Sequence, residues 1–249
     1  MVNLKSDQEI KIITEGGRRL RSVVKELLPL IKEGVATKEI DSRAEGLIKK
    51  QGGESSFKTV PDYLWTICSP INEQIVHTSP SDRVLKNGEV LTLDIGMLYQ
   101  GLHTDYAITK VVGENKDEKI NKFLKIGEQT LYQAIKEAKI GNHLGNISSA
   151  IEKEITNNGY FVIKELTGHG IGKKLHEDPY VFGFVDRPIN KSLSIKKGLV
   201  IAIEIIYAMG TDKIVYEKDD WSIITKDRSL SACFEHTVVV TSQGPIILT

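Results

Sequence analysis

One segment of this 249-residue chain recurs 110 residues later. Residues 85–95 read Leu-Lys-Asn-Gly-Glu-Val-Leu-Thr-Leu-Asp-Ile, and residues 195–205 read Ile-Lys-Lys-Gly-Leu-Val-Ile-Ala-Ile-Glu-Ile. Four upstream residues match four others at an offset of 107: Gly34, Ile40, Ile48 and Gly52 with Gly141, Ile147, Ile155 and Gly159. Short aliphatic strands can look alike by chance, but two registers with nearly equal offsets favour duplication. We therefore expect a single domain, residues 1–249, built from two similar halves, about 1–112 and 113–249. Asp94 and Glu204 would then occupy equivalent places about a pseudo-two-fold axis.

Each half is predicted to contain two amphipathic helices followed by strands. Ser6 and Glu9 have the spacing of a capping box, and apolar residues follow at helical intervals until Pro29. A second helix begins near Thr37 and ends before Gly52. The second half contains helices over about 117–138 and 144–157. The strands that we expect lie at residues 64–68, 74–77, 90–98, 102–112, 199–207 and 234–241. This pattern indicates the α+β class.

Several strands carry carboxylates on faces where a core would be expected. Because side chains alternate along a strand, Asp94 shares its face with Thr92 and Gly96, whereas the other face carries Leu91, Leu93, Ile95 and Met97. If residues 100 and 101 form a two-residue turn, Gly96 faces Asp105. Asp94 and Asp105 then lie on one face as diagonal neighbours, about 7–8 Å apart. A three-residue loop would put them on opposite faces.

Glu204 and Glu235 also lie within aliphatic strands, which brings the number of such carboxylates to four. Ionised carboxylates among aliphatic side chains are costly to bury unless they are paired or bound to a cation. None of the strand segments contains an arginine. One carboxylate could lie at an edge and face water, but that explanation is poor for all four together. A shared pair of divalent cations resolves the excess negative charge.

Residues 167–172 read Thr-Gly-His-Gly-Ile-Gly and place His169 between glycines, which permit close approach of the backbone. A lone histidine is more often structural, but beside four strand carboxylates we interpret His169 as a metal ligand. Four oxygen donors and one nitrogen argue against a structural zinc site, which favours Cys and His. They favour Mn²⁺, Fe²⁺, Co²⁺ or Zn²⁺ in a hydrolytic centre, and ligand type does not choose among these. The predicted ligand set is Asp94, Asp105, His169, Glu204 and Glu235.

The other histidines are interpreted from their neighbours. His77 and His176 could both reach such a cleft, and the residues alone leave this open. His103 and His143 are interpreted as structural or solvated. His236 alternates with Glu235, so it should point away from the metal face.

Composition excludes several classes of protein. Lys and Arg together number 33, as do Asp and Glu, so the formal net charge is zero and no basic footprint for nucleic acid is present. The most apolar stretch, residues 199–209, is too short to span a bilayer and contains Glu204. Two cysteines, Cys68 and Cys233, make no disulfide framework, so we expect reduced, buried thiols. Residues 1–8 contain no apolar signal segment, and the expected location is the cytoplasm.

Several short motifs occur together in this chain: Leu93-Asp94-Ile95, His103-Thr104-Asp105, residues 168–172 (Gly-His-Gly-Ile-Gly), His176-Glu177, Ile203-Glu204, residues 225–232 (Thr-Lys-Asp-Arg-Ser-Leu-Ser-Ala) and residues 234–237 (Phe-Glu-His-Thr). From about residue 5 to the end, the chain resembles type I methionine aminopeptidases of the short bacterial form. The resemblance implies the pita-bread fold, in which two pseudo-symmetric halves with an antiparallel sheet backed by helices surround a dinuclear metal site. It implies that the chain removes the initiator methionine from nascent proteins and peptides, by attack of a metal-bridging hydroxide on the first peptide bond.

The resemblance also implies a role for each predicted ligand. Asp94 would bind one ion, and Asp105 and Glu235 would bridge both. His169 and Glu204 would bind the other ion. Glu204 would in addition handle the proton of the bridging water.

For the substrate, the resemblance implies contacts from both halves. His176 would contact the scissile peptide and stabilise the tetrahedral intermediate, and His77 would hydrogen-bond near the leaving nitrogen. The free α-amino group would lie at the Asp94 ion. Tyr63, Cys68 and Trp221 match residues that line the methionine pocket, with ordinary core packing as the alternative.

Four positions depart from the pattern of this family. Ile205 stands where the family has proline, and Thr78 stands where it has glycine after the first histidine. Val60 and Leu175 stand at aromatic positions. The metal set is intact, so these departures bear on the shape of the methionine pocket and on the tolerance for the second residue of the substrate.

Two rival functions remain on the same fold. An Xaa-Pro aminopeptidase or prolidase usually carries an extra N-terminal domain, whereas the catalytic pattern here begins almost at residue 1. A non-catalytic binding module typically loses metal ligands, and all five are present here. The expected partners are nascent polypeptide N-termini, with ribosome contact left open, and the expected state is a monomer with no membrane or nucleic-acid partner.

Overall fold

The computed structural model describes residues 2–114, 116–219 and 221–249. Its α-helices are α1 (Asp7–Leu27), α2 (Thr37–Lys50), α3 (Glu118–Glu137) and α4 (Leu144–Asn157). Its strands are β1 (Glu54–Ser55), β2 (Ile67–Cys68), β3 (Gln74–Val76), β4 (Val90–Tyr99), β5 (Leu102–Val111), β6 (Phe161–Val162), β7 (Thr167–Gly170), β8 (Glu177–Phe182), β9 (Val200–Ala208), β10 (Ile214–Tyr216), β11 (Ile223–Thr225), β12 (Ser231–Thr241) and β13 (Gly244–Ile247).

The helices begin and end where the sequence predicts. The Ser6 hydroxyl accepts a hydrogen bond from the Glu9 backbone at 3.3 Å, and the Glu9 carboxylate accepts one from the Ser6 backbone at 2.9 Å, which completes the predicted capping box of α1. After α2, Gly52 takes a φ of 74°, a left-handed conformation that glycine adopts without strain. Among the described residues, no helix combines the length and the apolar character required to cross a membrane.

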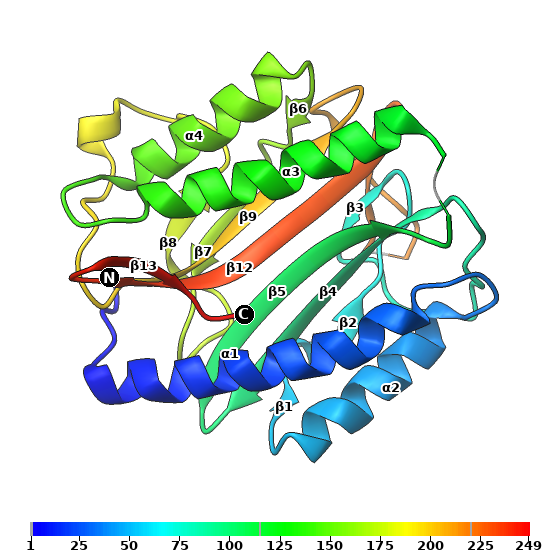
Figure 1. Ribbon diagram of the computed structural model, residues 1–249, viewed down its shortest axis with the longest axis horizontal. Coiled ribbons are helices and arrows are strands. Elements are labelled where there is room, and N and C mark those ends of the chain that lie inside the picture. The colour runs from blue at the N-terminus through cyan, green and yellow to red at the C-terminus, as the bar shows by residue number, and fades with distance from the viewer. Residues whose placement is uncertain (1, 115, 220) are drawn as a thin grey trace.

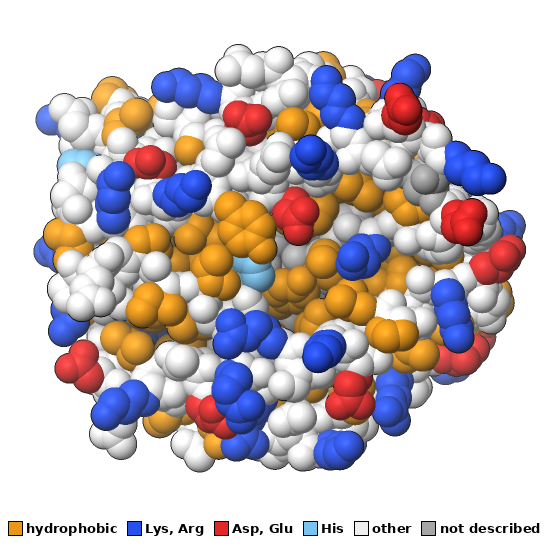
Figure 2. Space-filling model, in the orientation of Figure 1, with side chains coloured by type: hydrophobic (Ala, Val, Ile, Leu, Met, Phe, Trp, Pro, Cys, Tyr) orange, Lys and Arg blue, Asp and Glu red, His pale blue; other side chains and the backbone are white. Residues whose placement is uncertain are grey.

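Most of the described strands form one large antiparallel sheet with the helices on one side (Figure 1). Its central order is β1-β4-β5-β12-β9-β7-β8, and β10, β11 and β3 form a separate small sheet. Helices α1 and α2 cover β4 and β5, whereas α3 and α4 cover β9 and β12 (Figure 1). On this helix face, basic and acidic side chains are interspersed (Figure 2), in keeping with the zero net charge. The opposite face of the sheet is left free to form a site.

The β4–β5 hairpin has the register that was predicted to place Asp94 and Asp105 on the same face of the sheet. Gln100 and Gly101 have φ values of 48° and 80°, the pair of positive angles found in two-residue hairpin turns. Tyr99 consequently pairs with Leu102, and Gly96 pairs with Asp105. Asp94 and Asp105 therefore lie diagonally on one face, as predicted.

The cores of both halves lie between the sheet and its helices. Alternate residues of β4, such as Leu91 and Leu93, are buried against α1 and α2. In the second half, Ile201, Ile203 and Ile205 of β9 are buried against α3 and α4. Burying these aliphatic faces is the main stabilising contribution, and it turns the polar faces of the same strands away from the helices.

Matching backbone contacts recur at the offsets of the sequence repeat. An isolated bridge joins Ala36 to Val84 in the first half, and another joins His143 to Ser194 in the second. Ala36 and His143 are 107 residues apart, and Val84 and Ser194 are 110 residues apart, the same two offsets found in the sequence. Gly88 and Gly198, also related by 110, both have a φ of 85°. Asp94 on β4 and Glu204 on β9 therefore lie at corresponding places.

The strand predicted over residues 64–68 is shorter than expected. Within this segment, Ile67 and Cys68 pair with β4. The backbone N–H groups of Thr66 and Ile67 donate instead to the buried carboxylate of Asp41, at 2.7 and 3.1 Å. A side chain from α2 thus takes the place of a neighbouring strand, and no local sequence pattern reveals such a distant partner.

Two helical glycines give a matched test of this packing. A Cβ at Gly17 in α1 would lie 2.3 Å from the backbone oxygen of Leu248, whereas a Cβ at Gly46 in α2 would meet nothing within 4 Å. We expect Gly17→Ala to lower the free energy of unfolding by about 1–3 kcal/mol, because backbone must move. Gly46→Ala should raise it by about 0.5–1 kcal/mol through helix propensity. Urea unfolding curves measure both, and a Gly17→Ala variant as stable as wild type would contradict the packing.

Candidate metal centre

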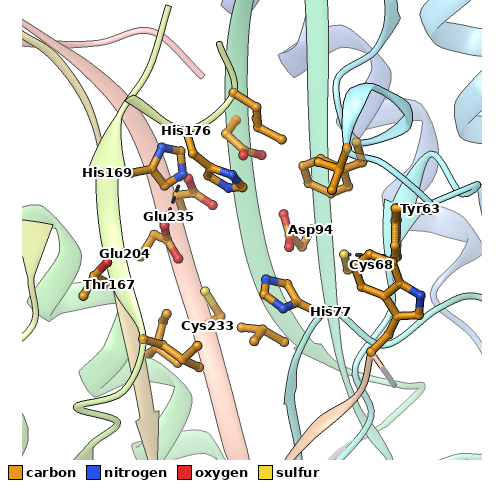
Figure 3. Close-up of a pocket in the computed structure, with 18 of the residues that line it drawn as sticks. Tyr63, Cys68, His77, Asp94, Thr167, His169, His176, Glu204, Cys233 and Glu235 are labelled. Carbon is orange, nitrogen blue, oxygen red and sulfur yellow. Dashed lines mark hydrogen bonds and ion pairs between the residues drawn. The ribbon is translucent and has the colours of Figure 1, made fainter. Parts of the chain in front are cut away.

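The ten side chains predicted to form the site all line one cavity of about 300 Å³ (Figure 3). Its floor is the face of the sheet that points away from the helices. The four carboxylates come from β4, β5, β12 and β9, which are consecutive neighbours at the centre of the sheet. They are Asp94, Asp105, Glu235 and Glu204, in that order across the strands.

The predicted ligands approach one another closely. Asp105, His169 and Glu235 each offer a ligand atom within 4.8 Å of the other two, and all three residues are buried. Nε2 of His169 lies 3.5 Å from Oε1 of Glu204. Glu204 and Glu235 are direct cross-strand partners, an arrangement of like charges that is unfavourable without a compensating cation.

Burial makes these carboxyl groups unusually weak acids. It raises the pKa of Asp94, Glu204 and Glu235 well above the ordinary value, and neighbouring carboxylates raise the pKa of each further. Burial raises the pKa of Asp105 to about 7, against the opposing effect of a hydrogen bond from the Tyr106 backbone. Four negative charges at this depth therefore require either protons or bound cations.

The ring of His169 turns a nitrogen that could bind a cation toward the carboxylates. Its Nδ1 lies 2.9 Å from the carbonyl oxygen of Gly170, and because a carbonyl can only accept, Nδ1 carries the proton. Nε2 is then left with its lone pair facing Glu204. Burial lowers the pKa of His169 to about 3, so the ring is neutral at pH 7. When Glu204 is ionised, the lone pair and the carboxylate oxygen that face each other at 3.5 Å are two acceptors with no donor between them.

Glu235 provides a second observation that fits a cation. In the part of the chain that the structure describes, its buried Oε1 has no hydrogen-bond partner. Buried polar atoms are almost always paired, so an orphaned carboxylate oxygen in this position requires an explanation. A divalent cation among Asp105, His169 and Glu235 would satisfy the orphaned oxygen and the facing acceptors together.

His176 and His77 stand on the cavity wall, as the resemblance implies. The ring of His176 packs edge-on against that of His169, with centroids 4.5 Å apart and an interplanar angle of 83°. Its partial burial lowers the pKa of His176. His77 projects from the opposite side of the cavity (Figure 3) and has a positive φ of 61°. His103, by contrast, is buried with Nδ1 2.9 Å from the Ser56 hydroxyl, so of the two interpretations, structural or solvated, the structure favours the first.

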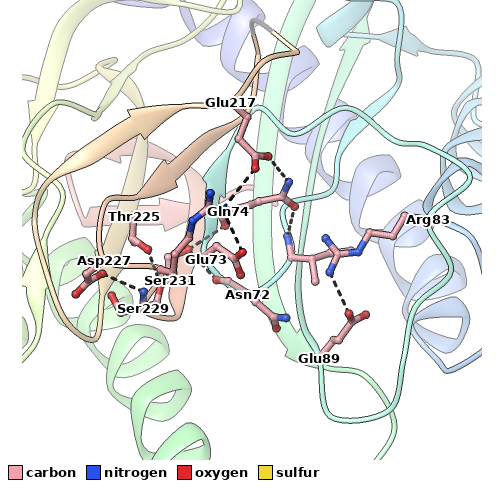
Figure 4. A network of polar contacts seen from close by, with 12 residues as sticks. Asn72, Glu73, Gln74, Arg83, Glu89, Glu217, Thr225, Asp227, Ser229 and Ser231 are labelled. Carbon is pink, nitrogen blue, oxygen red and sulfur yellow. Dashed lines mark hydrogen bonds and ion pairs between the residues drawn. The ribbon is translucent and has the colours of Figure 1, made fainter.

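A polar network holds the segment that leads to His77 (Figure 4). The Ser231 hydroxyl lies 3.1 Å from the backbone oxygen of Asn72 and 2.9 Å from that of Gln74. The Gln74 side chain donates to Glu217 at 2.8 Å. Since Gln74 begins β3 and Ser231 begins β12, these contacts fix the small sheet, and with it His77, to the strand that carries Glu235.

The predicted methionine pocket forms one end of the cavity. The ring of Tyr63 meets that of Trp221 edge-on, with centroids 4.9 Å apart. The Tyr63 hydroxyl donates to the Ile67 backbone at 2.8 Å and lies 3.2 Å from the sulfur of Cys68. These residues therefore do more than pack in the core, because Tyr63, Cys68 and Trp221 each also line the cavity.

Two of the four unusual positions face this cavity. Val60 and Leu175 line it, whereas Ile205 belongs to the core beneath α3 and α4. Thr78 is buried, and among the described residues its hydroxyl has no partner. The replacement of proline by Ile205 therefore bears on core packing, and the replacements at Val60 and Leu175 bear on the pocket.

Several residues of the cavity wall were not predicted from the sequence, among them Leu166, Tyr180, Ile206 and Cys233. Strand alternation would have found Cys233, which stands two residues before Glu235 on the same face of β12. The same argument places Ile206 beside Glu204. Tyr180 pairs with His169 across β7 and β8, a tertiary contact that no sequence spacing indicates.

Comparisons with known proteins agree with this geometry. A model of metallopeptidase family M24 matches residues 11–242. The chain is 40% identical over 249 residues to Methionine aminopeptidase 1 of Bacillus subtilis, a match that covers 100% of this chain and 99% of that protein. A crystal structure of methionine aminopeptidase from Thermotoga maritima superposes with a TM-score of 0.96 at 32% identity, covering 100% of this chain and 99% of the other.

A prolidase from Pyrococcus furiosus shares the fold more distantly, with a TM-score of 0.80 and 24% identity. The likeness covers 99% of this chain but 65% of the prolidase, so a third of that protein has no counterpart here. The expected α+β pita-bread fold is confirmed by these neighbours. The chain belongs to metallopeptidase family M24 and, within it, to the methionine aminopeptidases.

Proposed function

We propose that this chain is a metal-dependent aminopeptidase that removes the N-terminal methionine from polypeptides and binds two divalent cations. The observation that carries the proposal is the convergence of four buried carboxylates and one neutral imidazole on one cavity. In this proposal the whole chain is one catalytic domain, whose halves, about 1–112 and 113–249, contribute to opposite sides of the centre.

The five ligands divide between the two ions. Asp94 would hold one ion, His169 and Glu204 would hold the other, and Asp105 and Glu235, from the two strands at the centre of the sheet, would contribute to both. When bound, two such ions lower the pKa of a shared water and polarise the carbonyl of the first peptide bond. The oxygen-rich set accepts Mn²⁺, Fe²⁺, Co²⁺ or Zn²⁺ without selecting one of them.

Three side chains serve the proton and the peptide. Glu204 accepts the proton of the attacking water and passes it to the leaving nitrogen. His176 is neutral at pH 7 and donates its ring N–H to the carbonyl oxygen as negative charge develops there. His77 approaches from the other wall and hydrogen-bonds beside the leaving nitrogen. The placement of the two histidines on opposite walls supports this division.

The cavity also accounts for the choice of substrate. A free α-amino group would lie at the Asp94 side, so a chain without a free N-terminus would not be bound productively. Tyr63, Trp221 and Cys68 would enclose the unbranched methionine side chain, for which aromatic edges and sulfur are favourable neighbours.

Removal of initiator methionine takes place where proteins are made, so we propose the cytoplasm as the location and nascent polypeptides as the substrates. The ribosome would then be a transient neighbour. We propose that the chain acts as a monomer, because one chain supplies all five ligands.

The first prediction is metal-dependent release of methionine. Protein reconstituted with Mn²⁺, Co²⁺ or Fe²⁺ should release Met from a Met-Ala-Ser peptide, and Asp94→Ala or His169→Ala should lower kcat/KM at least about a hundredfold through loss of a ligand. Asp82→Ala removes a carboxylate whose side chain is 92% exposed, and it should leave the rate unchanged.

Peptide sequence separates this function from its closest rival. Release of alanine from an Ala-Pro peptide, without release of methionine from Met-Ala-Ser, would establish an Xaa-Pro specificity and overturn the proposal. Protein that binds no divalent cation would favour a non-catalytic binding module.

The second prediction concerns His176. His176→Ala should lower kcat by about a hundredfold to a thousandfold, because one donor to the developing oxyanion is lost. Metal content, measured by elemental analysis, should equal that of wild type. Loss of metal in this variant would make His176 a ligand and would contradict its proposed role.

The third prediction concerns pH and Glu235 in metal-free protein. Because burial raises the pKa of Glu235, the folded state binds more protons than the unfolded state above pH 4.5, and stability falls as pH rises. His169 acts oppositely, since its lowered pKa makes stability rise between about pH 3 and 6.5. The comparison of Glu235→Gln with wild type cancels the histidine contribution.

We therefore expect Glu235→Gln to be more stable than metal-free wild type, by a margin that grows from pH 5 to pH 8. The growth is at most about 1.4 kcal/mol per pH unit. Thermal midpoints across this range measure it, and Mn²⁺ should reverse the order by stabilising wild type. A margin that is constant with pH would mean that burial does not raise the pKa of Glu235 in the folded state.

A further inference from the structure

The two halves of the sheet meet between β5 and β12, where the backbone ladder is short. Among the described residues, the ladder pairs Glu235 with Ala107 and His236 with Tyr106. Continued by one residue in the same register, it would set Thr237 opposite Asp105. Continued in the other direction, it would set Thr109 opposite Cys233 two steps on. At both places a threonine side chain replaces the backbone pairing.

Each threonine hydroxyl binds both backbone groups of the residue opposite. The Thr237 hydroxyl accepts from the Asp105 N–H at 2.8 Å and donates to the Asp105 carbonyl at 2.9 Å. The Thr109 hydroxyl accepts from the Cys233 N–H at 2.9 Å and donates to the Cys233 carbonyl at 2.7 Å. Asp105 and Cys233 are 128 residues apart, as are Thr109 and Thr237, so the two contacts are pseudo-symmetric counterparts. We call them the Thr237 clamp and the Thr109 clamp.

The two clamps differ in the residue to which the threonine hydroxyl binds. The Thr237 clamp holds Asp105, a proposed bridging ligand, whereas the Thr109 clamp holds Cys233, which is not in the ligand set. Thr237 is fully buried on the face of β12 that also carries Glu235. Its own N–H donates to the Thr249 hydroxyl at 3.0 Å, so its backbone does not compete for Asp105.

We propose that Thr237 is a positioning residue for the metal centre: its hydroxyl, inserted between β5 and β12, sets the distance between the bridging carboxylates Asp105 and Glu235. The inference rests on the proposed ligand set. Asp105 is 4% exposed, so water is not available to replace the hydroxyl. Without it, the Asp105 N–H and carbonyl would be unpaired, and the strand would move to recover partners. That movement displaces the carboxylate that both ions share.

The test compares Thr237→Val, which removes the hydroxyl at nearly constant volume, with Thr109→Val as the matched control. Both variants lose a buried clamp, and both should have lower thermal midpoints than wild type. Thr237→Val should bind Mn²⁺ about 10–100-fold more weakly, the usual effect of removing a group that orients a ligand. Thr109→Val should bind Mn²⁺ as wild type does, and Thr237→Ser, which keeps the hydroxyl, should restore wild-type affinity. Titration calorimetry with Mn²⁺ measures the affinity directly, independently of peptidase activity.

Two results would overturn the inference: Mn²⁺ affinity of Thr237→Val equal to that of wild type, or an equal loss of affinity in Thr109→Val. If Thr237→Val does not fold, Thr237→Ala decides by the same criterion, because its smaller side chain removes the hydroxyl without crowding the strands. The failure of the metal centre itself is distinguishable, since wild type would then bind no Mn²⁺.

Discussion

The structure depends on one electrostatic constraint: four carboxylates must be buried together on strands that also build the core. Strand alternation makes this possible. One face of β4 and β9 carries aliphatic side chains that pack beneath the helices, and the other face carries Asp94 and Glu204. The aliphatic burial stabilises the fold, while the acidic face is unfavourable until cations arrive. The hydrophobic burial thus offsets the cost of holding negative charge in a region shielded from water, where a bound cation is attracted most strongly.

In the two-half arrangement that we propose, the sequence repeat relates some ligands of the centre to one another, whereas other ligands depart from this symmetry. Asp94 and Glu204 are related by the offset of 110 and keep equivalent places. The second carboxylates are not equivalent, because Asp105 corresponds to Cys233 and Ala107 corresponds to Glu235 at the offset of 128. Glu235 therefore lies nearest the axis, where it pairs with both Ala107 and Glu204. A strictly symmetric site would carry equal charges at corresponding positions, whereas here the thiol of Cys233 lines the cavity at the position that corresponds to the carboxylate of Asp105.

Much of the fold and the ligand set could be predicted from sequence because both depend on short-range periodicity. Counting across the hairpin turn was enough to place Asp94 beside Asp105, since a two-residue turn fixes the register. The rest depended on contacts between distant segments. Residues 64–66 were expected to extend the strand that contains Ile67 and Cys68, but the N–H groups of Thr66 and Ile67 donate to the carboxylate of Asp41 from α2. The Thr237 clamp was equally invisible, because a threonine in a strand is ordinary and its partner lies 132 residues away.

The unusual residues of the pocket can be ordered by the direction in which they point. Ile205 faces the core beneath α3 and α4, so it replaces a proline in the family pattern without touching the substrate cavity. Val60 and Leu175 do face the cavity, and each is smaller than the aromatic residue that the family pattern has there. The aromatic surface of the cavity comes instead from the Tyr63–Trp221 pair, together with Phe57 and Tyr180. Because an edge-on pair presents a ring face on one side and a ring edge on the other, it can contact an unbranched thioether along its length. Contact with a methionine side chain in this chain should therefore depend more on these two rings than on positions 60 and 175, where aliphatic residues stand.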